Sequence, residues 1–179
     1  MECRISSHGT LSLIGCVLFR LASIAQPASP ADQNADVSRW RTFANRAGWT
    51  IKHPSSWQVN SCRQCPDPTD PNVFVTLYNP STKEHIMIAH LIDKPPDQTV
   101  EQWLHDVKMM VFIPLVSEEW IFLNGTRALK VINRRADSTE IEYIYIVHGS
   151  KTFAISTNRN TPSYPLYQRM LSTLRFTSR

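Results

Sequence analysis

The dipeptide Asn124-Gly125 is the feature that most limits how this chain can fold. It lies between residues 120–123 and 126–132, two runs rich in the β-branched and aromatic side chains that are typical of strands. Asn and Gly both tolerate a positive φ, which the two-residue turns between antiparallel strands require. The pattern predicts a tight β-hairpin, and with it a sheet in which sequential strands pair side by side.

A second hairpin is predicted around Gly149-Ser150. Side chains alternate over residues 141–148, and residues 151–156 form another strand-like run. Gly48 can adopt the positive φ needed in a turn between two short strands near the start of the domain. The remaining predicted strands lie at residues 40–43, 49–52, 57–59, 72–78 and 85–92.

Two helices are predicted among the strands. Apolar residues recur at intervals of three and four from Thr99 to Phe112, with Gln102 at the capping-box position behind a Thr99 cap. Near the end, Ser163 is predicted to cap a helix that Pro165 starts. The sum is a single α+β domain, with a largely antiparallel sheet of six to eight strands flanked by two helices.

Composition fits one folded domain and argues against a nucleic-acid-binding protein. Of the 179 residues, 42% are apolar and 9% are aromatic, which is enough for a core. The net charge is +4, and no run of Lys or Arg is longer than the pair Arg134-Arg135. Binding to nucleic acid requires a basic stripe or patch, so it is not expected.

The first 25 residues are typical of a secretory signal peptide. The apolar stretch 11–19 gives way to small residues, and Ser23 and Ala25 suit cleavage before Gln26. We expect residues 1–25 to be a signal peptide, residues 26–37 a flexible mature N-terminus and residues 38–179 the folded domain. Export would place the protein in a periplasmic, extracellular or lumenal space.

A rival interpretation treats residues 13–16 as a lipoprotein box in which Cys16 becomes the lipidated N-terminus. Lipoproteins usually become polar after that cysteine, whereas Val17, Leu18 and Phe19 follow it here. Association with a membrane is expected only if Cys16 is lipidated.

The order of these segments resembles the PsbP-like family, whose fold is shared with the Ran-binding Mog protein. The resemblance spans about residues 40 to 177 and is carried by segments 43–57, 99–104, 124–128, 142–156 and 174–176. It implies an α/β/α domain without known enzymatic chemistry, often exported, which in photosynthetic members docks on the lumenal face of photosystem II. This chain differs from the plant-type members in its Cys62/Cys65 loop and in having no long basic docking arm.

Cys62 and Cys65 form the pair with the most suggestive spacing. A structural zinc needs four N or S ligands, but no second Cys pair follows the leader and the nearest histidines are distant in sequence. A redox pair usually starts a helix, whereas three prolines within residues 66–71 predict a loop. Arg63 could lower a thiol pKa, so redox chemistry stays open. The favoured interpretation is a structural disulfide between Cys62 and Cys65 in an oxidising compartment.

Other patterns give no catalytic residue, metal site or cofactor. His85 and His90 are five residues apart on a predicted strand, so they face opposite sides and cannot grip one metal together. Ser55, Ser56 and Asp93 supply the residue types of a hydrolase, but no strained Gly-x-Ser-x-Gly turn occurs.

Five tryptophans are candidates for the core or for a partner surface. Trp103 is in phase with the apolar stripe of its helix and is predicted to be buried. Trp40 is the better candidate for exposure, and Trp40 and Arg63 are the two residues we assign, from sequence, to binding.

The favoured function is that of an exported, non-enzymatic domain that binds a protein partner in an envelope or membrane-associated complex, through a sheet face or loops. The sequence identifies neither the partner nor the oligomeric state. The alternative is a thiol-disulfide oxidoreductase, with Cys62 as nucleophile and Cys65 as resolving thiol.

Overall fold

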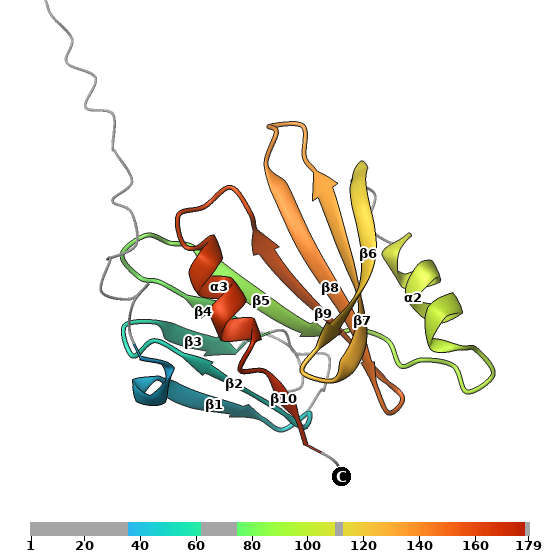
Figure 1. The fold of residues 1–179 in the computed structure, drawn as a ribbon, viewed down its shortest axis with the longest axis horizontal. Helices are drawn as coiled ribbons and strands as arrows, with labels where there is room; N and C mark the ends of the chain where they lie inside the picture. Colours follow the sequence, from blue (N-terminus) through green and yellow to red (C-terminus); the bar gives the residue numbers. More distant parts are fainter. Residues whose placement is uncertain (1–35, 62–74, 110–112, 178–179) are drawn as a thin grey trace, which may run out of the picture.

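Two antiparallel sheets form the framework of the domain (Figure 1). The computed structural model describes residues 36–61, 75–109 and 113–177. In this part of the chain, one sheet has three strands in the order β1-β2-β10, and the other has seven in the order β3-β4-β5-β9-β8-β7-β6. Every pair of neighbouring strands in both sheets is antiparallel.

The elements follow one another as η1 (Val37–Arg39), β1 (Arg41–Asn45), β2 (Trp49–His53), β3 (Gln58–Ser61), β4 (Val75–Tyr78), β5 (His85–His90), α2 (Val100–Lys108), β6 (Leu115–Leu123), β7 (Thr126–Arg134), β8 (Glu140–His148), β9 (Lys151–Asn158), α3 (Tyr164–Leu171) and β10 (Arg175–Phe176). The predicted α+β class, with a largely antiparallel sheet and two helices, is confirmed.

The hairpin predicted around Asn124-Gly125 joins β6 and β7. Asn124 has φ 52° and Gly125 has φ 83°, so both turn residues occupy the left-handed region. Leu123 pairs with Thr126 directly across the turn. The hairpin at Gly149 is likewise present, with φ 64° at that residue.

Helix α2 begins as predicted but has a different end. Thr99 accepts a hydrogen bond from the backbone N–H of Gln102, and the Gln102 side chain accepts one from the backbone N–H of Thr99, which completes a capping box. The helix was expected to reach Phe112. Its last helical residue is Lys108, and residues 110–112 lie outside the described part of the chain.

The cap of α3 differs from the prediction in its chemistry. Ser163 occupies the N-cap position, but its side chain makes no cap hydrogen bond. Its hydroxyl donates instead to the carboxylate of Glu84, in the turn between β4 and β5. The start of α3 is therefore fixed by a distant turn and by Pro165 in its first turn.

The seven-stranded sheet is covered on both faces. On one face, α3 and the three-stranded sheet pack over a row of cross-strand neighbours, Ile88, Ile155 and Ile144. On the other face, α2 packs through Trp103 and Leu104 over β7 and β8. The expectation that Trp103 is a core residue is confirmed.

The assignment of strands to sheets is where the prediction differs from the structure. Strands β1 and β2 were expected, but they form their own sheet with the short strand β10, which the sequence pattern did not indicate. The predicted signal peptide at residues 1–25 and most of the predicted flexible segment 26–37 lie outside the described residues. Those boundaries remain predictions.

Candidate functional site

The cysteines of the disulfide, redox and lipidation hypotheses are not among the described residues. Cys62, Arg63 and Cys65 lie outside the described residues, as does Cys16 of the predicted leader. The disulfide, the lipidation and the oxidoreductase alternative therefore stay predictions, and no described residue favours the oxidoreductase.

Trp40 is buried, and the expectation that it is exposed is wrong. Only 6% of the residue is accessible. The Arg169 guanidinium of α3 lies 5.3 Å from the centre of its ring, and the backbone N–H of Trp40 donates to the carbonyl of Val37. The side chain belongs to the core under α3. A binding role for Trp40 remains a prediction that would require this packing to open.

A Ser-His-Asp set does form, but in an order that cannot activate a nucleophile. His90 Nε2 lies 2.8 Å from Asp93 Oδ1, and the hydroxyl of Ser150 donates to Asp93 Oδ2 at 3.3 Å. The carboxylate sits between the other two groups, whereas a hydrolase needs the imidazole to stand between serine and carboxylate. Through Asp93, these hydrogen bonds connect the segment after β5 to Ser150 in the β8–β9 turn.

The two histidines of β5 face opposite sides, as expected. His85 is exposed, while His90 is buried with its ring 5.4 Å from that of Phe153. Among the described residues, no group of three or more His, Cys, Asp or Glu side chains could hold a metal ion.

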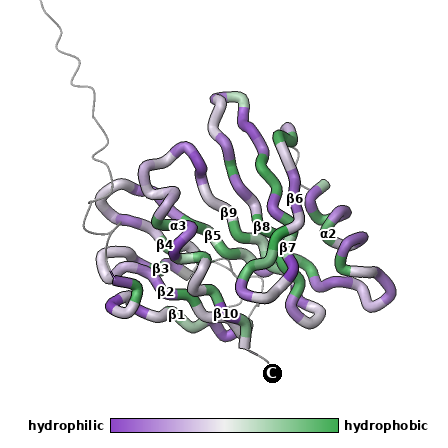
Figure 2. The backbone as a smooth tube through the Cα atoms, viewed as in Figure 1, coloured by the Kyte–Doolittle hydropathy of each residue, from purple (hydrophilic) through white to green (hydrophobic). Residues whose placement is uncertain are grey.

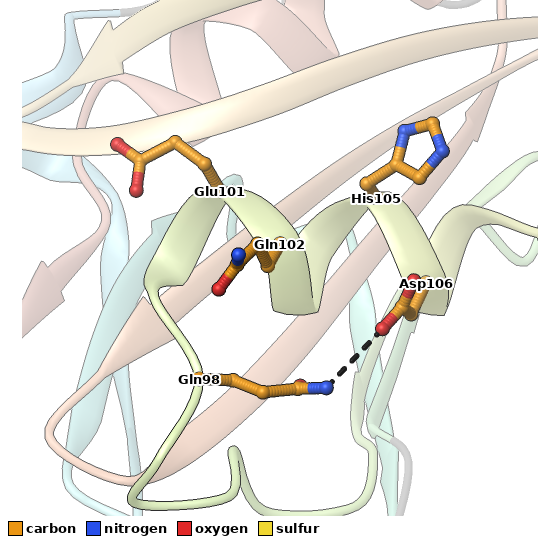
Figure 3. A pocket seen from close by; sticks show the side chains of 5 residues that line it. All are labelled: Gln98, Glu101, Gln102, His105 and Asp106. Atoms are coloured by element: carbon orange, nitrogen blue, oxygen red, sulfur yellow. Dashed lines mark hydrogen bonds between the residues drawn. The ribbon is translucent and has the colours of Figure 1, made fainter.

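The outer face of α2 carries a polar hollow of about 600 Å³ (Figure 3). Gln98, which precedes the helix, donates to Asp106 at 3.3 Å and so spans one side of this hollow. Glu101 and His105 lie along the same helix (Figure 3). The lining residues are all polar, and two of them, Gln98 and Asp106, are hydrogen-bonded to each other. Such a surface is typical of the solvent-facing side of an amphipathic helix.

Polar contacts to the buried Glu142 of β8 fix the other helix. Glu142 accepts hydrogen bonds from the hydroxyl of Tyr164 at 2.6 Å and from the amide of Gln168 at 3.1 Å. Burial, together with this bond to Glu142, raises the pKa of Tyr164 to about 12. Both donors lie on α3 and the acceptor is a buried carboxylate of β8, so these bonds hold α3 on the sheet.

The feature of the described chain that is not explained by folding is the outer edge of the large sheet. Strand β6 is nine residues long and ends the strand order, so one side of its backbone faces no neighbouring strand of the sheet. Phe122 is 77% exposed and Trp120 is 40% exposed. Leu115 and Val116, at the start of the strand, are also exposed. We call β6 with these four side chains the edge surface.

Register explains why these residues are exposed. Trp120 pairs with Leu129 and Phe122 with Arg127, so both aromatic side chains project from the face of the sheet that α2 covers. Helix α2 packs over Leu129 in the next strand and leaves β6 beside it (Figure 1). Figure 2 shows hydrophobic stretches toward both ends of β6, with a hydrophilic stretch between them.

Ion pairs hold the edge surface in place. The Arg127 guanidinium lies 4.4 Å from the centre of the Trp120 ring and also pairs with Glu101 of α2. Glu118 and Glu119, in the middle of β6, pair with Lys108 of α2 and Lys130 of β7. The Trp120 ring is thus oriented by a cation–π contact, and the acidic charge of the strand is neutralised by its own neighbours.

Sequence patterns missed this surface for a clear reason. The run 120–123 predicted a strand, but the strand begins five residues earlier, at Leu115. The sequence left Trp120 as a candidate for either the core or a partner surface, and the strand order is what decides between them. The acidic pair Glu118-Glu119 beside Trp120 was the available signal, since charged residues commonly mark an edge strand.

Together these features define an antiparallel α/β/α sandwich with an exposed apolar edge. Among solved structures, it is similar to the solution structure of cyanobacterial PsbP (CyanoP) from Synechocystis sp. PCC 6803. The TM-score is 0.56 at 12% sequence identity, over 80% of this chain and 95% of that chain. The PsbP-like fold expected from the sequence is confirmed, and at this identity the likeness concerns the fold alone.

No protein-family model matches the sequence, and neither does any curated protein. Within the described residues, no helix has the length and apolar character needed to cross a membrane.

Proposed function

We propose that this chain is a non-enzymatic binding protein, an accessory of an envelope or membrane-associated complex, and that its edge surface receives an extended segment of a protein partner. The observation that supports this function is the exposure of Trp120 and Phe122 on an edge strand. A long edge strand with apolar side chains is a ready template for strand addition.

The chemistry of the edge surface suits protein recognition. An added strand would pair its backbone with the open side of β6, and its side chains would cover Phe122 and Trp120. Trp and Arg are the residue types that most often dominate binding energy at interfaces, and here Trp120 and Arg127 stack on each other. We expect truncation of Trp120 to weaken binding by about 2 kcal/mol, or roughly 30-fold.

The proposal also includes export of the protein and a disulfide between Cys62 and Cys65. We infer that residues 1–25 are removed during export and that Cys62 and Cys65 then form a disulfide. An oxidising compartment favours that bond, and so short a loop would contribute at the low end of about 0–5 kcal/mol. Intact mass of the exported protein tests this directly, because it reports the cleavage site, any lipid on Cys16 and the loss of two hydrogens from the thiols.

Photo-crosslinking in the cells that produce the protein tests the edge surface. A benzoyl-phenylalanine placed at Phe122 conserves the aromatic ring and should give one discrete adduct with a protein. The matched control places the same group at Ala136, an exposed position in the β7–β8 turn. The purified partner should then bind the Trp120→Ser variant about 30-fold more weakly than the parent chain.

Two results would overturn the proposal. Equal adducts at Phe122 and Ala136, or none at Phe122, would remove the edge surface as the docking site. A turnover activity that disappears when a single polar side chain is replaced would remove the non-enzymatic assignment.

A further inference from the structure

Two hollows adjoin each other along strand β9. We call the first, of about 440 Å³, the sheet hollow, and the second, of about 390 Å³, the end hollow. Ser156 lines both of them. Each volume falls within the range of about 300–1,000 Å³ that is usual for small-molecule sites.

Strand register makes the two hollows continuous. In the sheet hollow, Ser156 pairs with Tyr143 of β8. In the end hollow, Asn158 pairs with Ile141, one alternation farther along both strands. Residues two apart on a strand face the same side of the sheet, so the floor of the sheet hollow continues into the end hollow.

The sheet hollow is apolar. Ala89 of β5 and Ala154 of β9 are cross-strand neighbours whose small side chains leave space in its floor. Leu91, Ile92 and Val107 also line it, and Ile92 is exposed. None of its described lining residues is a Lys, Arg, Asp or Glu. The sheet hollow therefore suits an apolar chain, because a charged group would be desolvated there without a counter-ion.

The end hollow gathers cationic side chains from two distant turns. Lys83 lies between β4 and β5 and Arg135 lies between β7 and β8, and both residues are exposed. Neither side chain makes an ion pair or a hydrogen bond within the described part of the chain. His85, which is also exposed, adds an imidazole to the same lining.

Two carboxylates share the end hollow, and both are engaged by the chain itself. Glu84 accepts hydrogen bonds from the hydroxyls of Ser163 and Thr82. Asp137 accepts one from the backbone N–H of Thr139 at 3.0 Å. The carboxylates thus have donors of their own, whereas the lysine and arginine of the hollow are available to an anionic ligand.

Arg135 links the charged end to the apolar floor. Burial raises the pKa of Tyr143, a residue of the sheet hollow, and the positive charge of Arg135 opposes that rise. Such an effect requires the guanidinium to lie near the tyrosine hydroxyl, because Coulomb interactions weaken with distance. One elongated molecule can therefore contact the apolar floor and the cations at once.

We propose that the two hollows together bind a long-chain carboxylic acid, with its apolar chain in the sheet hollow and its carboxylate in the end hollow. The chain lies over Ala89 and Ala154, and Lys83 and Arg135 donate hydrogen bonds to the carboxylate. Charge complementarity selects the acid over a neutral lipid with the same chain. This site is separate from the edge surface on β6 and does not depend on a protein partner there.

The test uses the full chain and cis-parinaric acid, a fatty acid whose fluorescence rises in apolar surroundings, with its methyl ester as the uncharged match. Saturable binding of the acid and weaker binding of the ester are expected. Lys83→Gln and Arg135→Gln should each weaken binding of the acid by about 2- to 5-fold, the value of one exposed ion pair, and leave the ester unchanged. In the double variant, the acid and the ester should have affinities within about 2-fold of each other.

Two kinds of control separate this site from non-specific adsorption. Lys151→Gln removes a cation at the opposite end of β9 and should leave binding of the acid unchanged in about 0.1 M salt, which screens charges farther apart than about 10 Å. Ala154→Leu and Ala89→Leu each fill part of the sheet hollow. They should weaken binding of both acid and ester by about 10-fold, since each displaces methylene groups of the chain.

Circular dichroism identifies a leucine variant that does not fold, and the other variant then decides. Phe122→Ser, on the edge surface, should leave binding unchanged. The proposal is overturned by an absence of saturable binding, by an unchanged preference for the acid in the double variant, or by an equal loss in Lys151→Gln. Parent-like affinity in a folded leucine variant would overturn it as well, and so would a loss in Phe122→Ser.

Discussion

The indole N–H of Trp103 in α2 donates a hydrogen bond of 2.6 Å to the hydroxyl of Thr152 in β9, and both residues are buried. This bond crosses from the helix to the sheet at the point where α2 is otherwise held by apolar contacts with Leu129 and Tyr145. It therefore sets the position of α2 on the sheet, beside β6.

Replacing Trp103 with Phe should lower the free energy of unfolding by about 2–4 kcal/mol, because it strands the Thr152 hydroxyl in the core and leaves a small cavity. Thr152→Val, which strands the indole N–H instead, should cost about 1–2 kcal/mol. Denaturant unfolding of both variants measures these changes.

The double variant is the control for the pair. With both polar groups gone, neither is left unsatisfied, so the combined loss should be smaller than the sum of the two by about 1 kcal/mol or more. Additive losses would show that the bond contributes nothing beyond the packing of each side chain.

Asn124 joins the β6–β7 hairpin to the end of α3. Its side-chain amide donates to the carbonyl oxygens of Leu171 and Leu174, at 3.1 Å and 2.7 Å. Asn124→Gly keeps the positive φ of the turn but loses both bonds, so we expect a loss of about 1–2 kcal/mol in unfolding free energy. Asn124→Ala should lose roughly 1 kcal/mol more, because alanine is strained in the left-handed region.

Gly125→Ala is the matched control, since a methyl group there meets no heavy atom within 4 Å while φ is 83°. Its cost is backbone strain alone, roughly 1 kcal/mol. If Asn124→Gly unfolds at the same denaturant concentration as the parent chain, the contacts with α3 do not stabilise the fold.

Local signals in the sequence predicted the local parts of the fold. The Asn124-Gly125 turn and the capping box of Thr99 and Gln102 depend on residues within a few positions of each other, and both are present. The opposite faces of His85 and His90 follow from strand alternation in the same way.

The features that the sequence could not predict depend on contacts between distant segments. The Ser163 hydroxyl bonds to Glu84, 79 positions away, instead of capping its own helix. Trp40 is buried because Arg169 and the rest of α3 come to cover it. The edge surface depends on strand order, which cannot be read from one strand alone.

Stability should fall at alkaline pH because several tyrosines have a raised pKa in the folded state. The pKa of Tyr164 is raised to about 12 by burial and by its bond to Glu142. The folded state then holds a proton that the unfolded state releases near pH 10, so unfolding becomes easier as the pH rises from about 10 to about 12. Burial also raises the pKa of Tyr145 and Tyr167, which act in the same direction.

Tyr164→Phe removes one of these contributions, so its unfolding free energy should decline less steeply between pH about 10 and about 12. Denaturant titrations at several pH values measure the slope, and absorbance of tyrosinate follows the ionisation itself. An equal slope in the variant and the parent chain would contradict the role of Tyr164.

Removal of the Tyr145 hydroxyl in β8 and of the Tyr164 hydroxyl in α3 should affect the unfolding free energy differently. Tyr145→Phe deletes a buried hydroxyl that has no partner among the described residues, so the unfolding free energy should stay unchanged or rise, by up to about 2 kcal/mol. Tyr164→Phe deletes a donor to the carboxylate of Glu142 and should cost about 1.5–3 kcal/mol near neutral pH. The two variants lose the same atom, so volume and hydrophobicity change alike. Denaturant unfolding compares them, and a loss in Tyr145→Phe as large as that in Tyr164→Phe would show that the Tyr145 hydroxyl is hydrogen-bonded in the folded protein.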